Sequence, residues 1–203
     1  MIYYVSNAPL LFSKLTRISA EESLQMLEKC DILQFDSETS GRDARLCDLL
    51  CIQFGSDKHD FQIVVDTSTI DVNIYKQVLE SKLLVLQNAK FDLQFLYNYN
   101  IIPRRVWDTM IVEQLLYLGY PYVSITPERY REFNYTFPYL INEDTESKAY
   151  GNHELSFSLK AIALKYLGID IDKTVRGEIM WRGLDESVAL YAAGDVMYLE
   201  KIM

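Results

Sequence analysis

The spacing of apolar and polar positions divides the first third of the chain into one helix and three strands. Residues 20–30 carry apolar positions at helical spacing, with two early glutamates where the helix dipole favours negative charge. Residues 31–38 follow as an apolar strand, and residues 45–55 and 59–66 as two more. The short link between the last two strands predicts an antiparallel hairpin.

Helices and strands alternate in the next part of the chain. A short apolar run at residues 82–87 predicts a buried parallel strand, and Asn88 directly after it is suited to cap the following helix. The segments expected to be helical are residues 72–81, 88–99, 154–169 and 185–203, and residues 106–118 pass from a short strand into a helix. This order predicts an α/β fold with a mixed sheet and helices on its faces.

Residues 119–153 interrupt the alternation, because they contain three prolines and many tyrosines and end in a polar run. We expect them to form an inserted loop or a small subdomain within a single domain that spans residues 1–203. The aromatic side chains of this insertion either stack on unpaired bases or pack a subdomain. They are Tyr120, Tyr122, Tyr130, Phe133, Tyr135, Phe137 and Tyr139.

Composition and charge narrow the class of protein. About half of the 203 residues are hydrophobic, and no apolar stretch approaches the roughly 20 residues of a membrane span. The N-terminal segment lacks the features of a secretory signal, and the three cysteines form no C-x-x-C pair, so we expect a soluble, cytoplasmic protein. The net charge of −9 argues against a general basic surface for nucleic acid but allows a pocket that binds a few nucleotides.

The segment QFDSETSG places two carboxylates, Asp36 and Glu38, on either side of Ser37 at the end of a predicted strand. Residues two apart on a strand project from the same face, so these carboxylates would repel each other unless a cation or a proton lies between them. Hard cations such as Mg²⁺ and Mn²⁺ prefer oxygen ligands. The alternative is a polar turn, because Asp, Ser, Thr and Gly all favour turns.

Two further segments carry residues suited to the same chemistry. Tyr191 and Asp195 are four apart on one face of the last predicted helix, where a phenol beside a carboxylate can orient or deprotonate a water. Asp92 falls in the first turn of another predicted helix. Taken alone, each has a simpler explanation: Tyr191 packs, Asp195 is solvated, and Asp92 complements the helix dipole.

Taken in order, these segments resemble the DEDD superfamily of 3′→5′ exonucleases, in its tyrosine branch. The motifs are FDSETSG, NAKFD and YAAGDV, with supporting matches at VWDTM and SLKAIALKYLG. The resemblance runs from about residue 20 to the end of the chain, and the superfamily includes the proofreading domain of family-A DNA polymerases and the RNase D group. It implies a ribonuclease-H-like fold, in which helices flank a mixed five-stranded sheet.

The resemblance also implies roles for individual residues. Asp36, Glu38, Asp92 and Asp195 correspond to the four acids that hold two divalent metal ions, Mg²⁺ or Mn²⁺. Asp36 is expected to bridge both ions. Tyr191 corresponds to the tyrosine that orients the attacking water.

Four neighbouring residues are candidates for substrate contacts: Thr39, Arg42, Asn88 and Lys90. Helix capping is the alternative role for Asn88, and simple solvation is the alternative for Lys90 and Arg42. Members of the superfamily often place an apolar wedge after the D-x-E motif. Residues 41–43 offer no such side chain here, so fraying of a duplex end would need another element.

The activity implied by the resemblance is a two-metal-ion removal of nucleoside 5′-monophosphates from single-stranded or frayed DNA 3′ ends. The motifs begin close to the first methionine, as in phage-type family-A polymerases, so we expect a proofreading domain with a polymerase domain in cis or in trans. The expected compartment is the cytoplasm of a bacterial or phage-infected cell. Two alternatives stay open: an RNase D-like enzyme that trims RNA 3′ ends, and a catalytically silent module that binds a partner.

Overall fold

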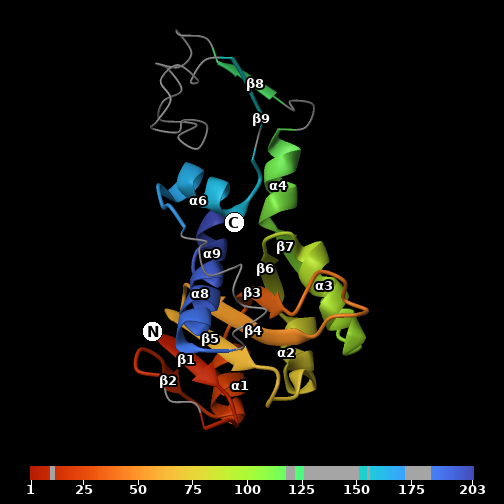
Figure 1. Ribbon diagram of the computed structural model, residues 1–203, viewed down its shortest axis with the longest axis vertical. Coiled ribbons are helices and arrows are strands. Elements are labelled where there is room, and N and C mark those ends of the chain that lie inside the picture. Colours follow the sequence, from red (N-terminus) through yellow and green to blue (C-terminus); the bar gives the residue numbers. More distant parts are fainter. Residues whose placement is uncertain (10–11, 118–121, 126–150, 155, 172–183) are drawn as a thin grey trace. The chain divides into compact units, whose positions relative to one another are not determined.

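The computed structural model describes residues 1–9, 12–117, 122–125, 151–154, 156–171 and 184–203, which form two compact units (Figure 1). The first unit contains the described residues up to Asp108 and those from 184 to 201. The second contains the described residues from Thr109 to 171. All of the residues predicted to form the site belong to the first unit.

A mixed sheet of seven described strands forms the centre of the first unit (Figure 1). Its strands are β1 (Ile2–Val5), β2 (Thr16–Arg17), β3 (Ile32–Thr39), β4 (Leu49–Ser56), β5 (Phe61–Asp66), β6 (Leu83–Leu86) and β7 (Arg105–Asp108). They are arranged in the order β2-β1-β5-β4-β3-β6-β7. The pairs β3–β4 and β4–β5 are antiparallel, and β6 is parallel to β3, as predicted.

The mixed α/β sheet is confirmed, but it is wider than the five strands that were expected. The additional strands, β1 and β2, extend the edge beside β5. Strand β1 pairs in parallel with β5, with Ile2 opposite Gln62. This pairing joins segments about sixty residues apart, so the local pattern of a four-residue run does not reveal it.

Helices cover both faces of the sheet in the first unit. They are α1 (Ala20–Glu28), the 3₁₀ helix η1 (Val72–Tyr75), α2 (Lys76–Ser81), α3 (Ala89–Asn98), α8 (Glu186–Val196) and α9 (Leu199–Ile202). Leu27 of α1, Leu79 of α2 and Phe95 of α3 share one buried core with Phe35 of β3. Helix α8 packs across β1, β3, β4 and β5, and its alanines form a second core.

No helix in the described part of the chain is long and apolar enough to cross a bilayer.

Two boundaries differ from those predicted. Strand β4 begins at Leu49 rather than residue 45, because residues 43–48 turn back and Ser40 pairs with Asp48 by a backbone hydrogen bond of 2.9 Å. The 185–203 segment forms two helices, α8 and α9, rather than one. Since β3 continues to Thr39, Asp36 and Glu38 lie inside a paired strand and not in the polar turn considered as the alternative.

The second unit contains α4 (Thr109–Leu116), α6 (Leu159–Leu167) and an antiparallel pair of strands, β8 (Tyr122–Ile125) and β9 (Gly151–Glu154). Helix α6 begins at its capping residue Ser158 and ends at Gly168, whose φ of +67° is the left-handed conformation that glycine adopts without strain. Within the predicted insertion, residues 119–121 and 126–150 lie outside the described residues, and so do the aromatic side chains expected to stack or pack there.

A buried ion pair joins α4 to α6 within this unit. Lys165 Nζ donates to Glu113 Oε1 at 2.6 Å and to the Tyr117 hydroxyl at 2.7 Å, while the Tyr166 hydroxyl donates to Glu113 at 2.8 Å. Burial alone would lower the pKa of Lys165, but its hydrogen bonds to Glu113 and Tyr117 raise it above the ordinary value. Both charged side chains are at most 10% exposed, so each has lost most of its contact with water and is stabilised by the opposite charge.

We expect Glu113→Ala to lower the free energy of unfolding by about 3–5 kcal/mol, because it leaves a buried ammonium without its counter-charge. Urea denaturation followed by circular dichroism measures this loss. The double variant Glu113→Leu with Lys165→Met should recover most of it, since both charges are then replaced by apolar groups. A double variant as unstable as Glu113→Ala would contradict the electrostatic explanation.

Candidate active site

Three carboxylates from two elements meet on the sheet face that α8 covers. Asp36 and Glu38 lie two apart on β3, opposite Gln53 and Cys51 of β4. One oxygen from each of these acids and one from Asp195 of α8 lie within 4.8 Å of one another. All three acids are partly buried. The structure therefore brings together three of the four predicted metal-site acids.

The electrostatics of this cluster favour a cation. Three carboxylates at this spacing repel one another, and partial burial weakens the screening by water. Their field reaches the neighbouring thiol: burial, followed by the charges of Glu38 and Asp36, raises the pKa of Cys51 well above its ordinary value. The ligand set contains only oxygen and suits Mg²⁺ or Mn²⁺. Asp36, Glu38 and Asp195 thus fit the divalent ions that the sequence predicted.

Asp92 lies beside this cluster but is not one of the three grouped acids. It is 1% exposed in the first turn of α3, and its Oδ1 accepts a hydrogen bond of 2.6 Å from Ser37 Oγ. Successive residues of a strand point to opposite faces, so Ser37 faces away from Asp36 and Glu38. Burial, followed by the charge of Asp36, raises the pKa of Asp92 well above its usual range. Its role at the metal site stays a prediction.

The start of α3 is fixed by Asp108, a residue whose role the sequence did not reveal. Asn88 has the position of the capping residue, but its side chain makes no capping hydrogen bond and its φ is +60°. The Asp108 carboxylate instead accepts hydrogen bonds from the backbone nitrogens of Asn88 and Ala89, at 3.0 and 2.8 Å. Asn88 is therefore the N-cap residue by position, as expected, but the hydrogen bonds that cap the helix come from Asp108. Asp108 lies within the supporting VWDTM match, which was the available signal.

Gln53 is a second residue that sequence reasoning missed. It is fully buried on β4, directly opposite Asp36, and its Nε2 donates to Asp36 Oδ2 at 2.8 Å. The hydrogen bond fixes the orientation of the carboxylate expected to bridge two ions. Nothing in the spacing of a buried glutamine distinguishes it from an ordinary strand residue. Only the pairing of β3 with β4 shows its role.

The remaining predicted residues lie around these acids on the same unit. Tyr191 precedes Asp195 by one helical turn on α8 and is partly buried. Asn88, Lys90 and Arg42 are exposed. Thr39 Oγ1 donates to the carbonyl oxygen of Gly41 at 2.6 Å, so its hydroxyl orders the chain directly after β3. The functions assigned to these residues stay predictions.

Comparison with known proteins decides the family. A family model described as 3′-5′ exonuclease, DNA_pol_A_exo1, matches residues 15–203. The chain belongs to this 3′-5′ exonuclease family. The resemblance that the acidic motifs indicated is therefore confirmed.

The exonuclease is also similar to part of a DNA polymerase. It is 33% identical over 97 residues to DNA polymerase I of Aquifex aeolicus (strain VF5). The match covers 47% of this chain and 16% of the polymerase, so the chain spans a small part of that relative's length.

Solved structures share the fold of the exonuclease at low sequence identity. The EXO domain of Aedes aegypti Nibbler gives a TM-score of 0.64 at 16% identity, covering 99% of this chain and 84% of that chain. Brucella melitensis NrnC gives 0.62 at 19% identity, covering 99% and 78%. Escherichia coli RNase D, an exoribonuclease, gives 0.61 at 20% identity, covering 89% and 40%. These likenesses confirm the expected ribonuclease-H-like exonuclease fold.

We expect Gln53→Leu to weaken Mn²⁺ binding by about 10- to 100-fold, because the carboxylate of Asp36 loses the donor that orients it. Titration calorimetry with Mn²⁺ and no nucleic acid measures the affinity directly. Gln34→Leu is the matched control. Gln34 is also a buried glutamine on a central strand, but it hydrogen-bonds Asp57 and the backbone nitrogen of Leu199. Equal losses in both variants would indicate a general packing effect.

Proposed function

We propose that this exonuclease removes nucleoside 5′-monophosphates from the 3′ end of single-stranded or frayed DNA. The observation that carries the proposal is the cluster of Asp36, Glu38 and Asp195, with Asp92 buried directly behind β3. A phosphodiester is anionic and resists attack by a negatively charged nucleophile. Its hydrolysis therefore needs positive charge at the scissile phosphate, and this cluster is built to concentrate cations.

Two divalent ions, Mg²⁺ or Mn²⁺, are the cofactors in this proposal. Asp36, Glu38 and Asp195 would hold these ions, with Asp36 as the shared ligand, and Asp92 would support them from the α3 side. When bound, such ions supply Lewis acidity and a water that is more easily deprotonated. The phenol of Tyr191, on the same helix as Asp195, would orient that water toward the scissile phosphate.

The substrate strand is held by groups around the acids. Lys90 and Arg42 offer cations to backbone phosphates, and Asn88 and Thr39 offer polar contacts near the terminal nucleotide. The 33% identity to a DNA polymerase I supports a proofreading role, with a polymerase domain supplied in cis or in trans. The fold likeness to RNase D supports trimming of RNA 3′ ends as the second candidate function.

We expect Asp36→Asn and Asp195→Asn each to reduce kcat on a 5′-labelled single-stranded DNA by about 10²- to 10⁴-fold, because each removes a charged ligand worth several kcal/mol. Gel analysis of product ladders in Mg²⁺ or Mn²⁺ measures the rates. Asp31→Asn is the control, since Asp31 is an exposed carboxylate whose side chain is 89% accessible. Full activity in Asp36→Asn would exclude the proposed site, and wild-type protein without hydrolysis would favour the silent binding module.

We expect single-stranded DNA to be degraded at least about tenfold faster than RNA of the same sequence, in keeping with the proposed proofreading role. The two oligonucleotides compete in one reaction, each with its own fluorophore, and the ratio of kcat/KM values is read directly. A preference for RNA would overturn the DNA assignment in favour of the RNase D-like function and leave the catalytic acids unaffected.

A further inference from the structure

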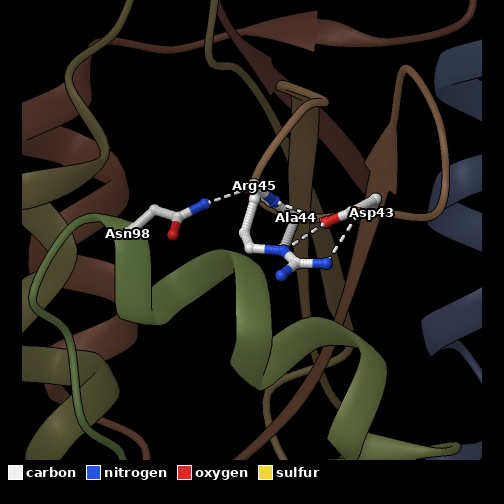
Figure 2. Close-up of polar contacts among 4 residues, drawn as sticks. All are labelled: Asp43, Ala44, Arg45 and Asn98. Carbon is white, nitrogen blue, oxygen red and sulfur yellow. Dashed lines mark hydrogen bonds and ion pairs between the residues drawn. The ribbon is translucent and has the colours of Figure 1, made fainter.

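A groove of about 500 Å³ lies between the turn that follows β3 and the exposed side of α3. Its walls are formed by Arg42, Asp43 and Arg45 from the turn and by Gln94 and Tyr97 from the helix. Figure 2 shows how the turn is attached to the helix: the side-chain amide of Asn98 donates to the carbonyl oxygen of Ala44. The two walls are therefore fixed to each other.

The groove carries a positive charge in a chain whose net charge is −9. Arg45 forms a two-point ion pair with Asp43, in which Nε and Nη2 each donate to a carboxylate oxygen at 3.1 Å (Figure 2). This contact lowers the pKa of Asp43. Arg42 is exposed and makes no hydrogen bond or ion pair with any described residue. One guanidinium is thus balanced and the other is available for an anion such as a phosphate.

The helix wall adds groups that suit a nucleobase. Tyr97 is 57% exposed, so its ring is accessible to a stacking partner. Gln94, one turn earlier on α3, is also exposed and carries both a donor and an acceptor. An exposed ring beside a free guanidinium is the combination with which proteins bind unpaired nucleotides: the ring stacks on a base and the cation contacts the backbone.

Both walls continue directly from elements that carry the catalytic acids. Arg42 follows Glu38 by four residues, so the chain allows at most about 14 Å between their Cα atoms. Gln94 follows Asp92 by two residues on the same helix, a rise of about 3 Å along its axis, and its side chain is exposed on a different face from the buried Asp92. A strand whose 3′ end lies at the acids therefore needs only a short path to reach the groove.

We propose that this groove binds nucleotides on the 5′ side of the scissile bond, with Arg42 on a backbone phosphate and Tyr97 stacked on a base. The inference rests on the proposed function, because it extends the path of the same substrate strand. It makes the enzyme selective for strands longer than a dinucleotide. Tyr97 and Gln94 thereby become length-determining residues that lie outside the metal site.

The test compares kcat/KM on a 12-nucleotide single-stranded DNA with kcat/KM on a 5′-phosphorylated dinucleotide. We expect Tyr97→Ala and Arg42→Ala each to lower the ratio of these two values by about tenfold or more. Tyr97→Phe and Arg42→Lys should keep most of the ratio, because the ring and the charge remain. Arg104→Ala is the matched control, since Arg104 is an exposed arginine that precedes β7, outside this groove. An unchanged ratio in Tyr97→Ala and Arg42→Ala would overturn the proposal.

A binding measurement separates failure of this inference from failure of the proposed function. Fluorescence anisotropy with the labelled 12-nucleotide strand in EDTA reports affinity without any hydrolysis. Removing Arg42 should reduce the slope of log affinity against log salt by about 0.7 to 1, and Arg104→Ala should not. The wild-type protein could hydrolyse neither substrate while Arg42→Ala still reduces the salt slope. That result would support the groove as a strand-binding site and contradict the proposed activity. Identical slopes and affinities in Arg42→Ala and wild type would exclude the groove as a strand-binding site. This is the result expected if the groove binds another anion, such as an acidic peptide.

Discussion

The site depends on holding three carboxylates together against their mutual repulsion. The oxygens of Asp36, Glu38 and Asp195 lie within 4.8 Å of one another. At about 4 Å, each pair of unit charges repels by about 1 kcal/mol in water and about 4 kcal/mol where the protein reduces screening. Two of these acids are fixed on β3, which pairs with β4 on one side and β6 on the other. The pairing with β4 fixes the backbone of both acids on one face, so a cation bound between their carboxylates relieves the repulsion.

The third carboxylate depends on the close approach of α8 to the sheet. Ala192 and Ala193 are fully buried against it. These small side chains allow α8 to lie close to the sheet. The two alanines of YAAGD are accordingly part of the construction of the site, since a larger side chain at either would push α8 and its Asp195 away from the sheet. Gly194 is different, because a Cβ added there would meet no atom within 4 Å.

The sequence predicted those features that local periodicity encodes. Alternation on a strand placed Asp36 and Glu38 on one face, and helical spacing placed Tyr191 one turn before Asp195; both arrangements are present. Features formed by contacts distant in sequence were missed. Asp108 secures the start of α3 from a neighbouring strand about twenty residues away, and Gln53 orients Asp36 across a strand pair. Neither residue has a period or a motif of its own, and β1 and β2 escaped prediction for the same reason.

Catalysis and choice of sugar are separable in this architecture. In the proposed mechanism the acids on β3, α3 and α8 act on a phosphodiester, a group that DNA and RNA share. Discrimination requires a contact at the 2′ position, where a hydroxyl is present or absent. The groups available for such a contact lie at the ends of the elements that carry the acids: Thr39 directly follows the strand carboxylates, and Asn88 and Lys90 flank the first residue of α3. Substitutions at these ends can change the sugar that is accepted without moving the acids. The two proposed functions, on DNA and on RNA 3′ ends, therefore differ at the contacts around the acids and share the proposed metal site.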